Sequence, residues 1–85
     1  MTREEIFAVV KANILEIVEH VDEADIQESA SMSDLYADSL EIVEVLSRSS
    51  KQLKLKVPFT ELAEARNIGD VVDAFARRST GRGEA

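Results

Sequence analysis

Apolar residues recur at intervals of three and four through most of this chain, and that periodicity restricts the fold more than any other feature. In the first segment the pattern runs from Ile6 to Val21. Such spacing gathers apolar side chains on one face of an α-helix. Thr2 and Glu5 stand just before it at the spacing of an N-terminal capping box. We therefore predict a first helix over residues 3–20.

A second periodic segment begins at Asp38. Asp38 is a favourable N-cap, and Glu41 follows at the third position, where it completes a capping box. We predict a helix over residues 38–53, with Ser39 in its first turn. Its predicted inward stripe consists of Leu40, Val43, Leu46, Ser50 and Leu53.

Two shorter segments complete the pattern. Pro58 disfavours helix in the residue before it, so we expect Pro58 to stop the second helix and a short third helix to span residues 60–65. Asn67 can cap a fourth helix, with Asp70 three residues on. The fourth helix is expected to bury Ile68, Val71, Val72 and Phe75 and to carry Arg77 and Arg78 in its last turn.

These segments predict an all-α fold, a four-helix bundle with a short third helix. A long structured loop over residues 22–37 separates the first two helices, and it leads directly to Ser39. One domain is expected over residues 1–78. Residues 79–85, which include two glycines, are expected to form a flexible tail.

Composition limits the possible functions. The chain has 85 residues, no cysteine and a net charge of −7, which disfavours nucleic acids and anionic membranes as partners. Residues 1–45 carry twelve acidic and two basic side chains, whereas residues 46–85 carry five and eight. The acidic half should steer the protein toward basic partner surfaces. Without a leader, a long apolar run or a disulfide, the chain is expected to be cytoplasmic.

Ser39 is the residue around which a function can be argued. A serine hydroxyl needs a nearby base to act as a nucleophile, and the only histidine, His20, falls near the end of the first predicted helix, where a capping role is expected. We therefore predict no catalytic residue and no metal site. Ser39 is better suited to be a substrate of another enzyme, because a phosphate esterified to it would sit at the positive end of a helix dipole. The alternative is that Asp-Ser-x-Glu is only a favourable helix start.

Three stretches together resemble the acyl carrier proteins of fatty acid and polyketide synthesis, over residues 3–78. They are Leu-Tyr-Ala-Asp-Ser-Leu at residues 35–40, Val57-Pro58, and Asn-Ile-Gly-Asp-Val-Val at residues 67–72. The resemblance implies that Ser39 receives 4′-phosphopantetheine from coenzyme A through a separate magnesium-dependent phosphopantetheinyl transferase. The thiol of that arm would then carry an acyl group as a thioester.

The resemblance also implies partners and a recognition surface. The expected partners are the transferase and acyltransferases, ketosynthases or related pathway enzymes, which would meet the carrier as a monomer. Recognition is assigned to the start of the second helix, at Asp38, Leu40, Glu41, Ile42 and Glu44. Ile42 could instead be loosely buried.

Two features depart from the family pattern. Tyr36 stands where most members have glycine, and the second helix becomes basic at Arg48, Lys51 and Lys54. These three side chains could form a basic ridge that complements the helix dipole or rejects enzymes with wholly basic docking surfaces. Residues 55–69 look like freestanding carriers of bacterial polyketide clusters, some of which donate acetyl units.

Two other functions stay open from the sequence. A peptidyl or aminoacyl carrier of a non-ribosomal peptide pathway would use the same serine and arm. An unmodified helical interaction module would use neither.

Overall fold

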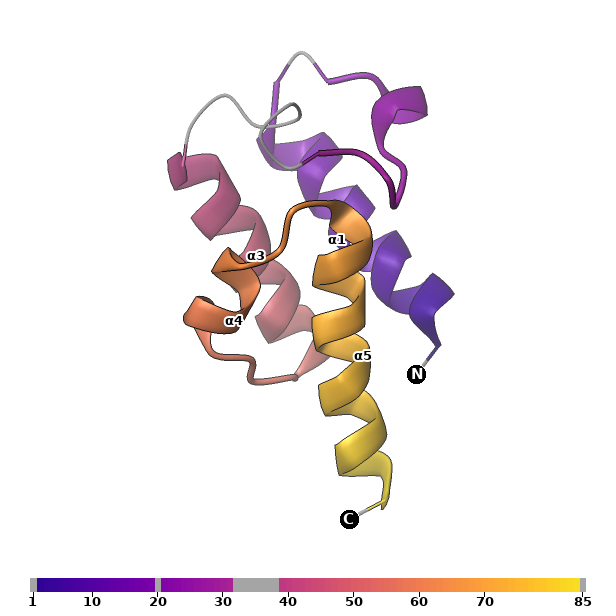
Figure 1. Cartoon of the computed structure of the whole chain (residues 1–85). Helices are drawn as coiled ribbons and strands as arrows, with labels where there is room; N and C mark the ends of the chain where they lie inside the picture. Colours follow the sequence, from indigo (N-terminus) through magenta and orange to yellow (C-terminus); the bar gives the residue numbers. More distant parts are fainter. Residues whose placement is uncertain (1, 20, 32–38, 85) are drawn as a thin grey trace.

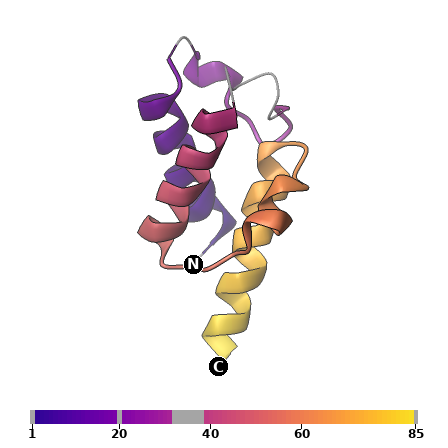
Figure 2. The same cartoon turned by 90° about the vertical axis from the view of Figure 1, so that its left-hand side faces the viewer.

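The computed structural model describes residues 2–19, 21–31 and 39–84, except for the side chains of Ser39 and residues 80–84. This part of the chain contains four α-helices, and the predicted all-α bundle is confirmed. They are α1 (Arg3–Ile17), α3 (Ser39–Leu53), α4 (Phe59–Ala63) and α5 (Ile68–Glu84), with a 3₁₀ turn, η1, at Glu23–Asp25. Helix α1 packs against α3 and α5, and the short α4 lies against α5 (Figures 1 and 2).

Helix α1 begins at the predicted capping box. The Thr2 hydroxyl accepts the Glu5 amide at 3.1 Å, and a Glu5 carboxylate oxygen accepts the Thr2 amide at 2.9 Å. The hydrogen bond from the Thr2 backbone holds the pKa of Glu5 below its ordinary value. The helix ends at Ile17 rather than residue 20, because Val18 is extended with ψ at 113°. Val18 is still buried, so the apolar pattern continues past the end of the helix.

Helix α3 ends by a local turn and not at proline, which corrects the predicted stop. The Lys54 amide donates to the Lys51 carbonyl at 3.2 Å, and the Leu55 amide donates to the Ser50 carbonyl at 3.1 Å. With Lys54 at a φ of 58°, this is a Schellman motif, closed by the buried side chain of Leu55. Pro58 instead precedes α4 as its N-cap residue.

Helix α5 confirms its predicted start. The Asn67 side-chain oxygen accepts the Asp70 amide at 2.8 Å, and the Asp70 carboxylate accepts the Arg66 amide at 3.0 Å. Its inward residues are fully buried, as expected: Ile68, Val71, Val72 and Phe75.

The end of α5 differs from the sequence expectation. The helix continues through Glu84 and extends beyond the other helices (Figure 1), so residues 79–84 are helical rather than irregular. Adding a residue to a packed helix needs no new nucleation, and no proline interrupts this stretch. The two glycines each lower helix propensity by about 1 kcal/mol without blocking the helix. The flexibility of this segment stays a prediction.

Arg77 and Arg78 consequently lie inside α5 and not in its last turn. Both contact Glu61 of α4, at 2.9 and 3.1 Å. The hydrogen bond from Arg77, followed by that from Arg78, holds the pKa of Glu61 below its ordinary value. These pairs tie α4 to α5.

The core lies between α1, α3 and α5. It consists of Ile6, Val10, Ile14, Val18, Ile26, Val45, Leu46, Leu53, Leu55, Leu62, Ile68, Val71, Val72, Ala74 and Phe75. Polar contacts also join α1 to α3: the buried Asn13 side-chain amide donates to Ser49 Oγ at 2.8 Å and to Gln52 Oε1 at 2.9 Å. In the described ranges, no helix is both long and apolar enough to cross a bilayer.

Candidate functional site

The rotation of α3 about its axis decides which of its side chains are available to other molecules. Val45 and Ser49 are 0% exposed, whereas Leu40 is 78% and Val43 is 43% exposed. The predicted inward placement of Leu40 and Val43 is therefore wrong. The physical reason is the buried hydrogen bond from Asn13 to Ser49, which lets a polar residue occupy the face toward α1. Leu46 and Leu53 are buried as predicted, whereas Val45 and Ser49 take the buried positions that were assigned to Val43 and Ser50.

Ser39 is the first residue of α3, as expected, while Asp38, its predicted N-cap, lies outside the described residues. The first amides of an α-helix have no partner within the helix and point along its positive end. A phosphodiester attached at Ser39 would therefore meet backbone donors without needing a basic side chain. The neighbouring Leu40 is largely exposed, so the start of α3 is open to a second molecule. This local arrangement fits a phosphate-linked group.

The described part of the loop is held by the N-terminus of α5. The Gly69 amide donates to the Glu28 carbonyl at 2.8 Å, and the Ile68 amide donates to the Ala30 carbonyl at 3.2 Å. These loop carbonyls satisfy two amides that the helix itself leaves free. A Cβ at position 69 would lie 3.2 Å from the Glu28 carbonyl oxygen, so glycine permits this close approach.

Ion pairs reinforce the same attachment. Arg3 of α1 contacts both Glu28 in the loop and Asp73 of α5. Lys11 of α1 pairs with Glu23 of η1 at 3.2 Å. The described chain segment that precedes residues 32–38 is thus fixed to two helices.

The other predicted recognition residues differ in how far their side chains are exposed. Leu40 and Glu44 are exposed, Glu41 is intermediate and already has an interaction, and Ile42 is half-buried against the core. Glu44 is paired with Arg48, at 3.5 Å between Oε1 and Nη2. The four described residues therefore do not form a uniform acidic front.

The predicted basic ridge is also divided. Arg48 bonds Glu16 of α1 at 3.2 Å as well as Glu44, which makes it the centre of an ion triad. Lys54 lies past the end of α3 in the left-handed region. Lys51 makes no ion pair with any residue in the described ranges. Of these three basic side chains, Lys51 is therefore the one that is left without an ion pair among the described residues.

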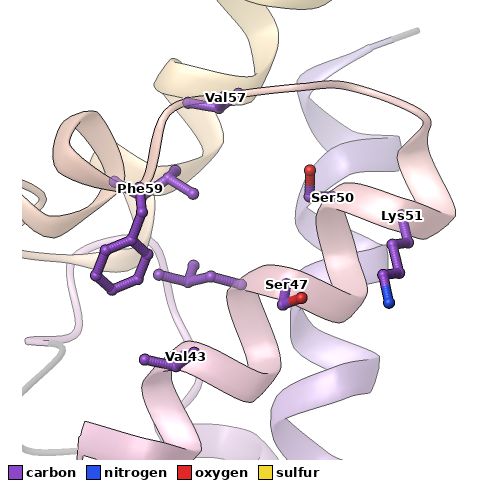
Figure 3. Close-up of a pocket in the computed structure, with 8 residues that line it drawn as sticks. Val43, Ser47, Ser50, Lys51, Val57 and Phe59 are labelled. Carbon is purple, nitrogen blue, oxygen red and sulfur yellow. The ribbon is translucent and has the colours of Figure 1, made fainter.

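Sequence reasoning missed a groove between α3 and α4. It has a volume of about 440 Å³, and Phe59 of α4 faces the side of α3 that carries Val43 (Figure 3). Phe59 is 50% exposed. The lining residues are Val43, Leu46, Ser47, Ser50, Lys51, Val57, Phe59 and Leu62. The one available signal was Phe59 itself, an aromatic residue directly after the proline that starts a five-residue helix.

Comparison with known proteins gives this arrangement a family. Residues 10–75 match the family model described as "Phosphopantetheine attachment site". The polyketide biosynthesis acyl-carrier-protein AcpK of Bacillus subtilis is 30% identical over 75 residues, which cover 88% of this chain and 92% of that protein. The acyl carrier protein of Thermotoga maritima is 35% identical over 78 residues, which cover 91% and 95%.

A solved structure supports the same family as the family model and the two relatives. A chain in the crystal structure of the curacin biosynthetic pathway HMG synthase in complex with acetyl donor-ACP superimposes with a TM-score of 0.80 at 30% identity. The match covers 91% of this chain and 99% of that one. The resemblance seen in the sequence is confirmed, and the chain belongs to the acyl carrier proteins, the non-catalytic carriers whose cofactor is 4′-phosphopantetheine.

Proposed function

We propose that Ser39 is the attachment point of 4′-phosphopantetheine and that a separate phosphopantetheinyl transferase transfers it from coenzyme A. The observation that carries this proposal is the place of Ser39 as the first residue of α3, inside the matched span of residues 10–75. The helix N-terminus supplies the electrostatic setting for the phosphodiester. When bound, the arm supplies a thiol that holds an acyl group as a thioester.

Mass spectrometry tests this proposal directly. Incubation with coenzyme A, magnesium and a promiscuous transferase should add the mass of one arm, and Ser39→Ala should abolish the gain while circular dichroism stays unchanged. Ser47→Ala is the matched control, because Ser47 is an exposed serine of the same helix but lies inside it, away from the free amides. An arm located at another serine, or no gain where a control carrier is loaded, would refute the proposal.

We further propose that the cargo is an acetyl group for an HMG synthase of a polyketide pathway. Support comes from the superposition on the complex of the curacin HMG synthase with its acetyl donor and from the relative named for polyketide biosynthesis. The relatives reported above are acyl carriers, which favours this cargo over an aminoacyl group.

Loading and transfer can be measured separately. The modified chain, charged with acetyl, malonyl or an amino acid, should pass only the acetyl group to an HMG synthase of this type, as followed by the mass of the carrier. Equal transfer from an aminoacyl-loaded chain, or no transfer of acetyl, would refute the acetyl-donor assignment without affecting Ser39 as the attachment point.

We also propose that residues 1–78 act as a single monomeric domain in the cytosol. Among the described residues, the core runs from Ile6 to Phe75, and a chain without cysteine suits a reducing compartment. Truncation after Arg78 should leave the melting temperature and the modification of Ser39 unchanged, and sedimentation should give the mass of one chain.

A further inference from the structure

Helix α3 does not bury the face that its apolar residues alone would select. Counted at 3.6 residues per turn, these residues point on average roughly 40° away from the residues that are buried. The apolar residues are Leu40, Ile42, Val43, Val45, Leu46 and Leu53, and the buried ones are Val45, Leu46, Ser49 and Leu53. A rotation toward the apolar average would cover Val43, which is 43% exposed. Because burial of apolar area favours that rotation, another contact must oppose it.

Asn13 of α1 provides this contact. Its side chain is 2% exposed, and its amide donates to Ser49 Oγ at 2.8 Å and to Gln52 Oε1 at 2.9 Å. Both N–H groups of the amide are therefore used, and the two acceptors lie on one side of α3 because they are three residues apart. Two attachment points on one side of a helix fix its rotation about its own axis. Turning α3 would break these bonds and leave buried polar groups without partners, which is unfavourable.

We propose that Asn13 is a positioning residue for the modification of Ser39. By fixing the rotation of α3, it sets the direction in which the exposed Leu40 and Glu44 are offered to the transferase. Asn13 is itself buried, so it acts only through α3. Its contribution is orientation more than stability, since an apolar pair of similar shape could fill the same space. The proposal rests on the proposed function for the identity of the reaction.

Kinetics and stability together test this role. The apolar-pair variant, Asn13→Leu with Ser49→Ala, should unfold at an equal or higher urea concentration. Its KM in the transferase reaction should rise by about threefold or more at unchanged kcat, as expected for lost binding contacts.

Ile14→Val is the matched control, because Ile14 is a fully buried neighbour of Asn13 on α1 with an apolar side chain. It should unfold at a lower urea concentration and keep its KM. An unchanged KM for the apolar-pair variant, or an equal rise in both variants, would overturn the proposal.

A single introduced thiol measures the rotation itself, since the chain has no cysteine. With Val43→Cys, the reaction of the thiol with a maleimide should be slower by about twofold or more in the apolar-pair background than in the natural one, because the position becomes less exposed. Lys51→Cys, at an exposed position of α3, should react at the same rate in both backgrounds.

A milder variant covers the case in which the apolar pair prevents folding. Gln52→Ala removes one of the two attachment points at an exposed residue, so it should preserve the fold and slow the thiol at position 43 by a smaller factor. Equal rates at position 43 in the natural and Gln52→Ala backgrounds would refute the attachment.

The thiol measurement uses the unmodified chain, so it separates this inference from the proposed function. If Ser39 is never modified, the proposed function fails, and the rates at position 43 still decide whether Asn13 fixes the rotation of α3. A slower thiol at position 43 with an unchanged KM would show that the rotation does not govern recognition, which would also overturn the proposal.

Discussion

Val45→Ala and Val43→Ala make the same chemical change two residues apart on α3, and the structure predicts different losses of stability. Val45 is 0% exposed and Val43 is 43% exposed. Removing two buried carbon groups costs about 1.6 kcal/mol in transfer free energy, and the remaining cavity adds to this cost. Alanine recovers about 0.5 kcal/mol through its higher helix propensity. The expected net loss for Val45→Ala is about 2 kcal/mol.

For Val43→Ala the transfer cost is about half as large, and the gain in helix propensity nearly offsets it. The expected change is within about 0.5 kcal/mol of zero. Urea unfolding followed by circular dichroism measures both values, with the slope of the transition as a check that unfolding remains two-state. In thermal unfolding, Val45→Ala should lower the melting temperature by roughly 8 to 16 °C. Equal losses, or a larger loss for Val43→Ala, would show that α3 packs by its other face.

Three further predictions concern positions that the fold makes special. Lys54→Gly should raise the free energy of unfolding in urea by about 0.5 to 1 kcal/mol, because glycine relieves the left-handed backbone at φ 58°; a loss would contradict the Schellman end of α3. In a double-mutant cycle, Asn13→Ala and Ser49→Ala should show a coupling of about 1 kcal/mol, since either change alone leaves a buried polar partner; additive losses would exclude the hydrogen bond. Because the folded pKa of Glu61 lies below its ordinary value of 4.5, the stability that this carboxylate adds is present above that pH and is lost as the pH falls through the folded pKa. The natural chain should therefore have a larger free energy of unfolding than Glu61→Gln at pH 7 and an equal one in strong acid. In an Arg77→Ala background this difference in stability at neutral pH should be smaller. A difference that does not change with pH would contradict the pairing of Glu61 with the two arginines.

Local chemistry in the sequence was sufficient for the capped starts of α1 and α5 and for the family. Thr2 with Glu5 and Asn67 with Asp70 are capping pairs that act within three residues, so the spacing of the residue types alone identifies them. The position of Ser39 at the start of the second helix could likewise be predicted from the residues next to it in the sequence. The Asp-Ser-Leu motif could be matched to acyl carriers for the same reason.

The tertiary structure decided which face of α3 is buried, because that depends on contacts between distant residues. Two stripes along α3 were possible, and the hydrogen bond between Asn13 and Ser49, 36 residues apart, selects the one that leaves Val43 outside. The groove with Phe59 exists only because α4, which packs against α5, faces α3 across it. Likewise, the charge pattern at the site depends on Arg48 reaching Glu16 of α1, a pairing that no local spacing in the sequence specifies.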